Sequence, residues 1–108
     1  MARIAALVPD LMFASKVEAT LRTAGHDVEL VSSVEAVDGD GEGPDLVIAD
    51  LGEIEASELT GRGLPVLGFY SHVEVETRRR AEAAGIDLIV PRSRMAREMP
   101  ALVDSLLG

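Results

Sequence analysis

The chain has 108 residues, 47% hydrophobic but only 3% aromatic, so the core of one ordinary domain has to be built from aliphatic side chains and methionine. Acidic residues number 19 against 10 basic ones, and the net charge of −9 argues against nucleic-acid and membrane partners. The absence of cysteine excludes disulfides and thiolate metal sites.

The first apolar run, residues 4–8, does not alternate with polar residues and fits a strand that is buried on both faces. Pro9 ends the run after five residues, which is too short for a signal peptide or a membrane span. We therefore expect a cytoplasmic location.

A helix is predicted over residues 11–24. Asp10 can cap it, because its carboxylate can accept an amide hydrogen bond from the first turn. The apolar stripe consists of Ala14, Val17, Leu21 and Ala24. Gly25 follows where a left-handed stop is favoured.

A second strand is predicted within residues 26–33, with Val28 and Leu30 facing inward. Residues 33–38 favour at most a stunted helix. Residues 38–45 indicate a flexible acidic loop, which resembles half a calcium-binding loop but lacks the other ligands at the required spacing.

The middle of the chain alternates again between strand and turn. A third strand is predicted over residues 45–51 and delivers Asp50 at its end. One or two helical turns are expected in residues 53–63, and a fourth strand over residues 64–70.

The next helix is predicted over residues 71–85. Ser71 and Glu74 have the spacing of a capping box, and Gly85 closes the helix. His72 is expected to be exposed rather than a ligand.

Three consecutive arginines, residues 78–80, form a basic run on this helix. Glu74 precedes Arg78 by four residues and Glu76 precedes Arg80 by four, which indicates a solvated face with stabilising ion pairs. The alternative interpretation is contact with a partner.

The fifth strand is predicted over residues 86–91. Pro100 interrupts the segment after this strand, so we expect a turn near residues 93–98 and a helix over residues 100–107. Leu102, Val103 and Leu106 are predicted to face the sheet.

Strand and helix thus alternate five times, which predicts a single three-layer α/β domain over residues 1–108, with a parallel sheet covered on both faces. Sites in such sheets lie beyond the carboxyl ends of the strands. Asp50 stands at one of these ends.

Two segments carry a resemblance to a known family: "PDLVIADL", residues 44–51, and "AEAAGIDLIVPRS", residues 81–93. Together with the order of the elements, they resemble the receiver (CheY-like) domain of two-component response regulators. The resemblance implies a flavodoxin-like fold with strand order 2-1-3-4-5, here with shortened second and third helices.

The resemblance also implies a site. Asp50 matches the phosphoacceptor position, Tyr70 with Ser71 beside it matches the hydroxyl position, and Arg92 stands where the family has a lysine. Of the two acids that help to bind Mg²⁺, at most Asp10 is present, so the metal set Asp10 and Asp50 implies weak Mg²⁺ binding or no cofactor.

Four of these residues, all except Tyr70, also have a purely structural interpretation. Asp50 could cap the turn after its strand, and Asp10 and Ser71 could cap helices. Arg92 could be an ordinary surface arginine, or it could bridge to Asp50 in place of the missing cation.

The functional hypothesis is a stand-alone, atypical receiver-like signalling module that is not an enzyme and acts through protein contacts. Its expected partners are a histidine kinase or a downstream signalling protein, and a homodimer is a further expectation. The alternatives are a small-ligand-binding or enzymatic flavodoxin-like domain and a subunit that mainly dimerises. The loop at residues 8–13 lacks the glycines that cradle phosphate in such enzymes.

Overall fold

The computed structural model describes residues 2–37, 43–71 and 74–108. Its five strands form one parallel sheet of order β2-β1-β3-β4-β5, as predicted. The strands are β1 (Arg3–Leu7), β2 (Asp27–Leu30), β3 (Leu46–Asp50), β4 (Val66–Tyr70) and β5 (Leu88–Pro91). The helices are α1 (Leu11–Thr23), α2 (Val75–Ala84) and α3 (Arg92–Leu107), and single 3₁₀ turns η1 (Glu35–Val37) and η2 (Ala56–Glu58) replace the second and third helices.

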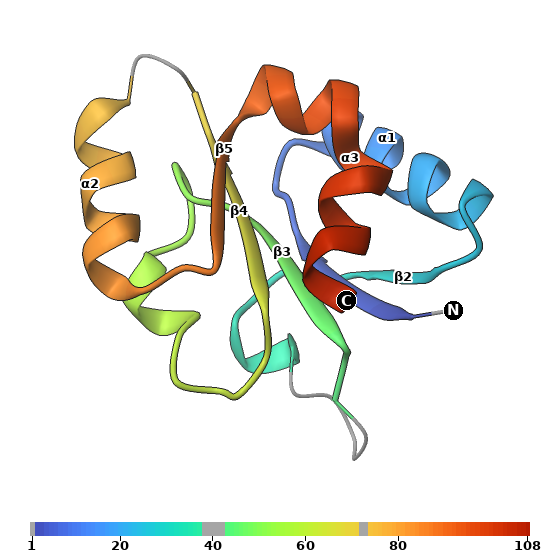
Figure 1. Ribbon diagram of the computed structural model, residues 1–108, viewed down its shortest axis with the longest axis horizontal. Coiled ribbons are helices and arrows are strands. Elements are labelled where there is room, and N and C mark those ends of the chain that lie inside the picture. Colours follow the sequence, from blue (N-terminus) through green and yellow to red (C-terminus); the bar gives the residue numbers. More distant parts are fainter. Residues whose placement is uncertain (1, 38–42, 72–73) are drawn as a thin grey trace.

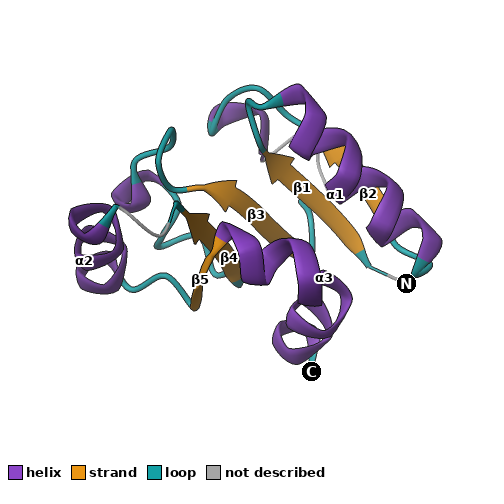
Figure 2. Cartoon of the chain, turned by 90° about the horizontal axis from the view of Figure 1, so that it is seen from above, coloured by secondary structure: helices purple, strands orange, loops and turns teal. Residues whose placement is uncertain are grey.

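Helices cover both faces of the sheet (Figures 1 and 2). Helices α1 and α3 pack against each other on one face, and α2 packs beside η2 on the other. Alternate residues of each central strand enter the two cores, so that Ile4 belongs to one and Ala5 to the other. This double burial explains why the strands appear in the sequence as continuous apolar runs.

Helix α1 begins and ends where predicted. Asp10 is its N-cap, and Gly25 follows its end with φ 96°. The prediction that Ala24 and Leu30 face the core is wrong. Ala24 is exposed because it is the C-cap beyond the buried stripe. Leu30 is 42% exposed, since it ends an edge strand that has a neighbour on one side only.

Helix α2 begins later than expected. It starts at Val75, with Glu74 as its N-cap, so the prediction that Ser71 caps the helix is wrong. One half of the capping box is confirmed, because the Ser71 N–H donates to Glu74 Oε1 at 3.1 Å. Gly85 closes the helix in the left-handed conformation, as predicted. His72 and most of the acidic loop lie outside the described residues.

Helix α3 consists of two helical segments that meet at a kink, so the predicted break before the Pro100 helix is confirmed, while the predicted turn near residues 93–98 is helical instead. Residues 93–98 are already helical up to Glu98, which leaves helical geometry at φ −121° and ψ 17°. Pro100 lacks an N–H and restricts the residue before it, so the helix bends two residues upstream and continues. Leu102 and Val103 are buried and Leu106 packs against the same core, as predicted. No helix in the described part of the chain has the length and apolar character needed to cross a membrane.

Candidate functional site at the carboxyl edge of the sheet

Four of the five predicted site residues follow directly from the strand order. Parallel strands end at one edge, where β3 delivers Asp50 and β4 delivers Tyr70. Asp10 starts α1 just beyond β1, and Arg92 starts α3 directly after β5. The residues that the sequence places in one site therefore gather at one edge of the sheet.

Asp10 uses both of its carboxylate oxygens. Oδ1 accepts the N–H groups of Met12 at 3.0 Å and Phe13 at 3.2 Å, which confirms the helix cap. Oδ2 accepts a hydrogen bond from Arg92 Nη2 at 2.6 Å. The bond from Arg92, followed by the bond from the Phe13 amide, lowers the pKa of Asp10 below its ordinary value.

Arg92 is held by an aromatic face as well as by a carboxylate. Its guanidinium carbon lies 4.3 Å from the centre of the Phe13 ring, and that ring meets Phe69 edge-on at 5.0 Å. The alternative in which Arg92 bridges to Asp50 is wrong, because the guanidinium bonds to Asp10 Oδ2 instead. The guanidinium pairs with Asp10 because it can rest on Phe13 there and form a short hydrogen bond at the same time.

Asp50 is half-buried, and its Oδ1 accepts the N–H of Gly52 at 3.0 Å. This bond confirms the interpretation of Asp50 as a cap of the turn after its strand. Burial of the carboxyl raises its pKa; Glu53 and Glu74 act in the same direction, while the Gly52 bond and the charge of Arg92 oppose it. The fold therefore disfavours the charged form of Asp50.

The last residue of β4, Tyr70, and the residue after it, Ser71, have partners on α2 and at its N-cap, respectively. Tyr70 is buried, and its hydroxyl accepts a hydrogen bond from Arg78 Nη1 at 3.4 Å. Ser71 donates its backbone N–H to Glu74. A role for Tyr70 and Ser71 in contacting a phosphoryl group remains a prediction.

Glu74 is a member of this site that the sequence did not indicate. Its Oε2 accepts from Thr77 Oγ1 at 3.3 Å, while Oε1 accepts from Ser71. A Cβ built on Gly52 would lie 3.0 Å from Glu74 Oε2 and 3.3 Å from Asp50 Oδ1. Glu74 is thus a second carboxylate beside Asp50. The capping-box spacing marked this residue, but only as a helix-start residue.

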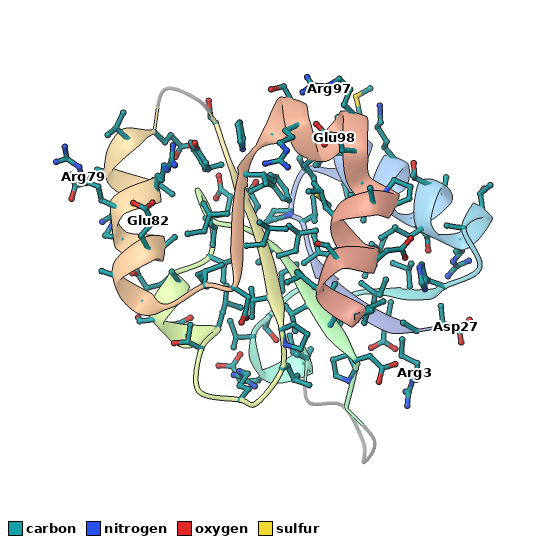
Figure 3. The ribbon with its side chains drawn as sticks, in the orientation of Figure 1. Arg3, Asp27, Arg79, Glu82, Arg97 and Glu98 are labelled. Carbon is teal, nitrogen blue, oxygen red and sulfur yellow. The ribbon has the colours of Figure 1, made fainter. Side chains whose placement is uncertain are left out.

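The basic run on α2 forms a different ion pair from the predicted ones. Arg78 pairs with Glu82 at 3.5 Å rather than with Glu74, whose carboxylate is bound to Ser71 and Thr77. In Figure 3, Arg79 projects from the outer side of α2, away from the sheet, and Glu82 is exposed on the same helix. The interpretation as a solvated helix face therefore holds for this part of the run, with altered pairing.

The donor set does not suit a firmly held Mg²⁺ ion. Mg²⁺ prefers an octahedron of oxygens, in which one or two carboxylates free to coordinate it are joined by several waters. Asp10 already shares its carboxylate between a helix cap and a guanidinium. Across residues 2–37, 43–71 and 74–108, no three acidic or histidine side chains come together in a way that could hold a metal.

The comparisons with known proteins agree with this architecture. No family model matches the sequence, and no curated protein matches it. Among solved structures, the HemR receiver domain from Leptospira biflexa superposes with a TM-score of 0.78 at 17% identity, over 100% of this chain and 95% of that one. A response regulator receiver protein from Burkholderia phymatum superposes with a TM-score of 0.81 at 20% identity, and the match covers 100% of this chain and 96% of that one.

NtrX from Brucella abortus gives a TM-score of 0.81 at 19% identity. The match covers 98% of this chain but only 27% of the NtrX chain. These structures cover this chain from end to end at low sequence identity. The chain therefore has the flavodoxin-like fold of the CheY-like receiver domains of response regulators.

Proposed function

We propose that the chain is a receiver-like signalling module that acts through protein contacts, in which Arg92 takes the electrostatic place of a divalent cation. The observation that carries the proposal is the 2.6 Å bond between Arg92 and Asp10 at the edge where Asp50 ends its strand. A guanidinium is always charged and binds a carboxylate without any need for metal.

The proposal places Asp50 at the phosphoacceptor position but makes it a poor acceptor. A phosphoryl group brings negative charge, which has to be balanced where it is transferred. The cation at this edge is already paired with Asp10, and a second acid, Glu74, lies beside Asp50. The module therefore signals without an enzymatic reaction of its own, and Mg²⁺ is absent or weakly bound.

The surface beside this edge carries exposed apolar side chains, which favour contact with another protein. Leu11 is 79% exposed and Met12 is 86% exposed at the start of α1, beside the Asp10 cap. The strongly negative chain is unsuited to nucleic acid or anionic membranes. The proposed partner is a histidine kinase or a downstream signalling protein. A homodimer is a further proposal, and analytical sedimentation tests it. The cytoplasmic location stays a prediction.

Intact-mass measurement after incubation with acetyl phosphate and Mg²⁺ tests the proposal. We expect the wild-type chain to gain little or no phosphoryl group. A rapid gain of one phosphoryl group that disappears in Asp50→Asn would overturn it and identify a working phosphoacceptor.

A further inference from the structure

We propose that Glu74 is an internal anion that occupies the hydrogen-bond donors beside Asp50 and keeps other anions out of this position. The inference rests on the proposed function, because it assumes that the functional site of the chain is the sheet edge around Asp50. It concerns why a negatively charged group does not bind there.

The first observation is that the Glu74 carboxylate is fixed at both oxygens. Oε1 accepts the N–H of Ser71 at 3.1 Å, and Oε2 accepts the hydroxyl of Thr77 at 3.3 Å. The backbone N–H of Glu74 donates in turn to the Ser71 carbonyl at 2.8 Å. The side chain is therefore folded back over the start of α2 instead of extending into solvent.

The second observation places this carboxylate against the turn after β3. The nearest atoms to a Cβ built on Gly52 are Glu74 Oε2 at 3.0 Å, Glu74 Oε1 at 3.1 Å and Asp50 Oδ1 at 3.3 Å. Gly52 and Thr77, a hydrogen-bond partner of Glu74, both line one small hollow of about 100 Å³. The absence of a side chain at position 52 is what leaves room for Glu74 beside Asp50.

These contacts give Glu74 two effects on an incoming anion. Its charge repels the anion, and its oxygens already accept from the Ser71 amide and the Thr77 hydroxyl, which the anion would otherwise use. An anion must displace the side chain to bind. Because the competitor is part of the chain, it is always present at a high local concentration.

The test is a titration with inorganic phosphate, in which the backbone amide signals of Gly52 and Ser71 are followed by NMR at constant ionic strength. We expect Glu74→Ala to bind phosphate at least about tenfold more tightly than the wild-type chain, since both donors are freed and one negative charge is removed. Glu76→Ala is the matched control. It removes the same charge from an exposed position in the first turn of α2 and is expected to behave as wild type.

The same comparison is repeated with Asp50→Asn present in both chains, so that the remaining carboxylate cannot mask binding. If Glu74→Ala does not give a folded spectrum, Glu74→Gln is titrated instead. It keeps the acceptor oxygen but loses the charge, and an affinity gain of about threefold is expected. Equal phosphate affinity with and without Glu74 in both backgrounds overturns the inference.

Failure here is separate from failure of the proposed function. Phosphate binding needs no covalent chemistry, so it reports on Glu74 alone. Phosphorylation of the wild-type chain at Asp50 overturns the proposed function, whatever the phosphate titration shows.

Discussion

Arg92 Nη2 donates to Asp10 Oδ2 at 2.6 Å and thereby ties the start of α3 to the start of α1, 82 residues away in sequence. The same guanidinium rests 4.3 Å from the centre of the Phe13 ring. The pair is partly exposed, at 40% for Arg92 and 43% for Asp10, so solvent weakens the attraction while the ring contact adds to it.

Replacing Arg92 by alanine should lower the melting temperature by roughly 2–5 °C, because both contacts are lost and α1 is no longer tied to α3. Arg97→Ala is the matched control. It removes a pair with Glu98 at 3.4 Å on the same helix, where Arg97 is 68% exposed, and should change the melting temperature by no more than about 1 °C. Equal effects of the two substitutions would contradict the special role of Arg92.

Asp10→Asn should separate the charge of Asp10 from its capping role, since asparagine also caps helices. The folded pKa of Asp10 lies below its ordinary value of 3.8, chiefly because of the bond from Arg92. The contribution of the charged Asp10 carboxylate to the free energy of unfolding is therefore complete when the pH lies above the ordinary pKa. It is lost as the pH falls through the lower pKa of the folded state.

Urea unfolding as a function of pH measures this effect. Wild type should be the more stable chain near neutral pH, and the difference from Asp10→Asn should close in acid. A difference in unfolding free energy that does not change with pH would show that the charge of Asp10 is not responsible.

Asp50→Asn should raise the stability of the fold. Burial, aided by Glu53 and Glu74, raises the folded pKa of Asp50 above its ordinary value of 3.8. The protonated form is thus the one that the fold prefers. The contribution of the protonated Asp50 to the free energy of unfolding is complete when the pH lies below the ordinary pKa. It is lost as the pH rises through the higher pKa of the folded state.

Asp50→Asn should therefore have a larger free energy of unfolding than the wild-type chain at raised pH, and the difference should vanish in acid. Urea unfolding as a function of pH measures this difference. Glu76→Gln removes a charge from an exposed position and serves as the control. A loss of stability in Asp50→Asn near neutral pH would show that the bond to the Gly52 amide outweighs burial of the charge.

Gly68→Ala should destabilise the chain by about 1–3 kcal/mol through overpacking. A Cβ at position 68 in the central strand β4 would lie 2.6 Å from Leu51 Cδ1 and 2.8 Å from its Cγ. Leu51→Ala alone should cost about 2–5 kcal/mol, because it leaves a cavity.

The double substitution at Gly68 and Leu51 should cost less than the sum of the two single ones, because the new methyl group enters the space that the leucine leaves. Denaturant unfolding of the four chains measures this coupling. Additive costs would mean that Leu51 can move away from position 68 at no energetic cost.

Much of the architecture was predictable from the sequence, because the signals that specify it are local. Continuous apolar runs indicate strands buried on two faces, and the strand ends lie within two residues of the predicted ones, except that β2 ends three residues earlier. Asp10, Gly25 and Gly85 act at helix ends, where the physics concerns only a few neighbouring residues. The strand order came from the family resemblance rather than from periodicity.

The side-chain partners in the site were not predictable in the same way. Arg92 could have paired with either Asp10 or Asp50, and the choice depends on the Phe13 ring, which only the packing of α1 against α3 brings into place. Glu74 was marked by local spacing, but its position beside Asp50 depends on how the turns after β3 and β4 meet. Such pairings join residues from segments that are far apart in the sequence and meet only at the sheet edge. No periodic pattern in the sequence therefore predicts them.

The double use of the Asp10 carboxylate has an evolutionary consequence. One oxygen holds the first turn of α1 and the other holds Arg92, so a substitution at either position leaves the remaining member of the pair without its counter-charge. Positions 10 and 92 are therefore expected to covary among descendants of this sequence, and a lineage that gained an ion-binding acid pair at this edge would have to alter both.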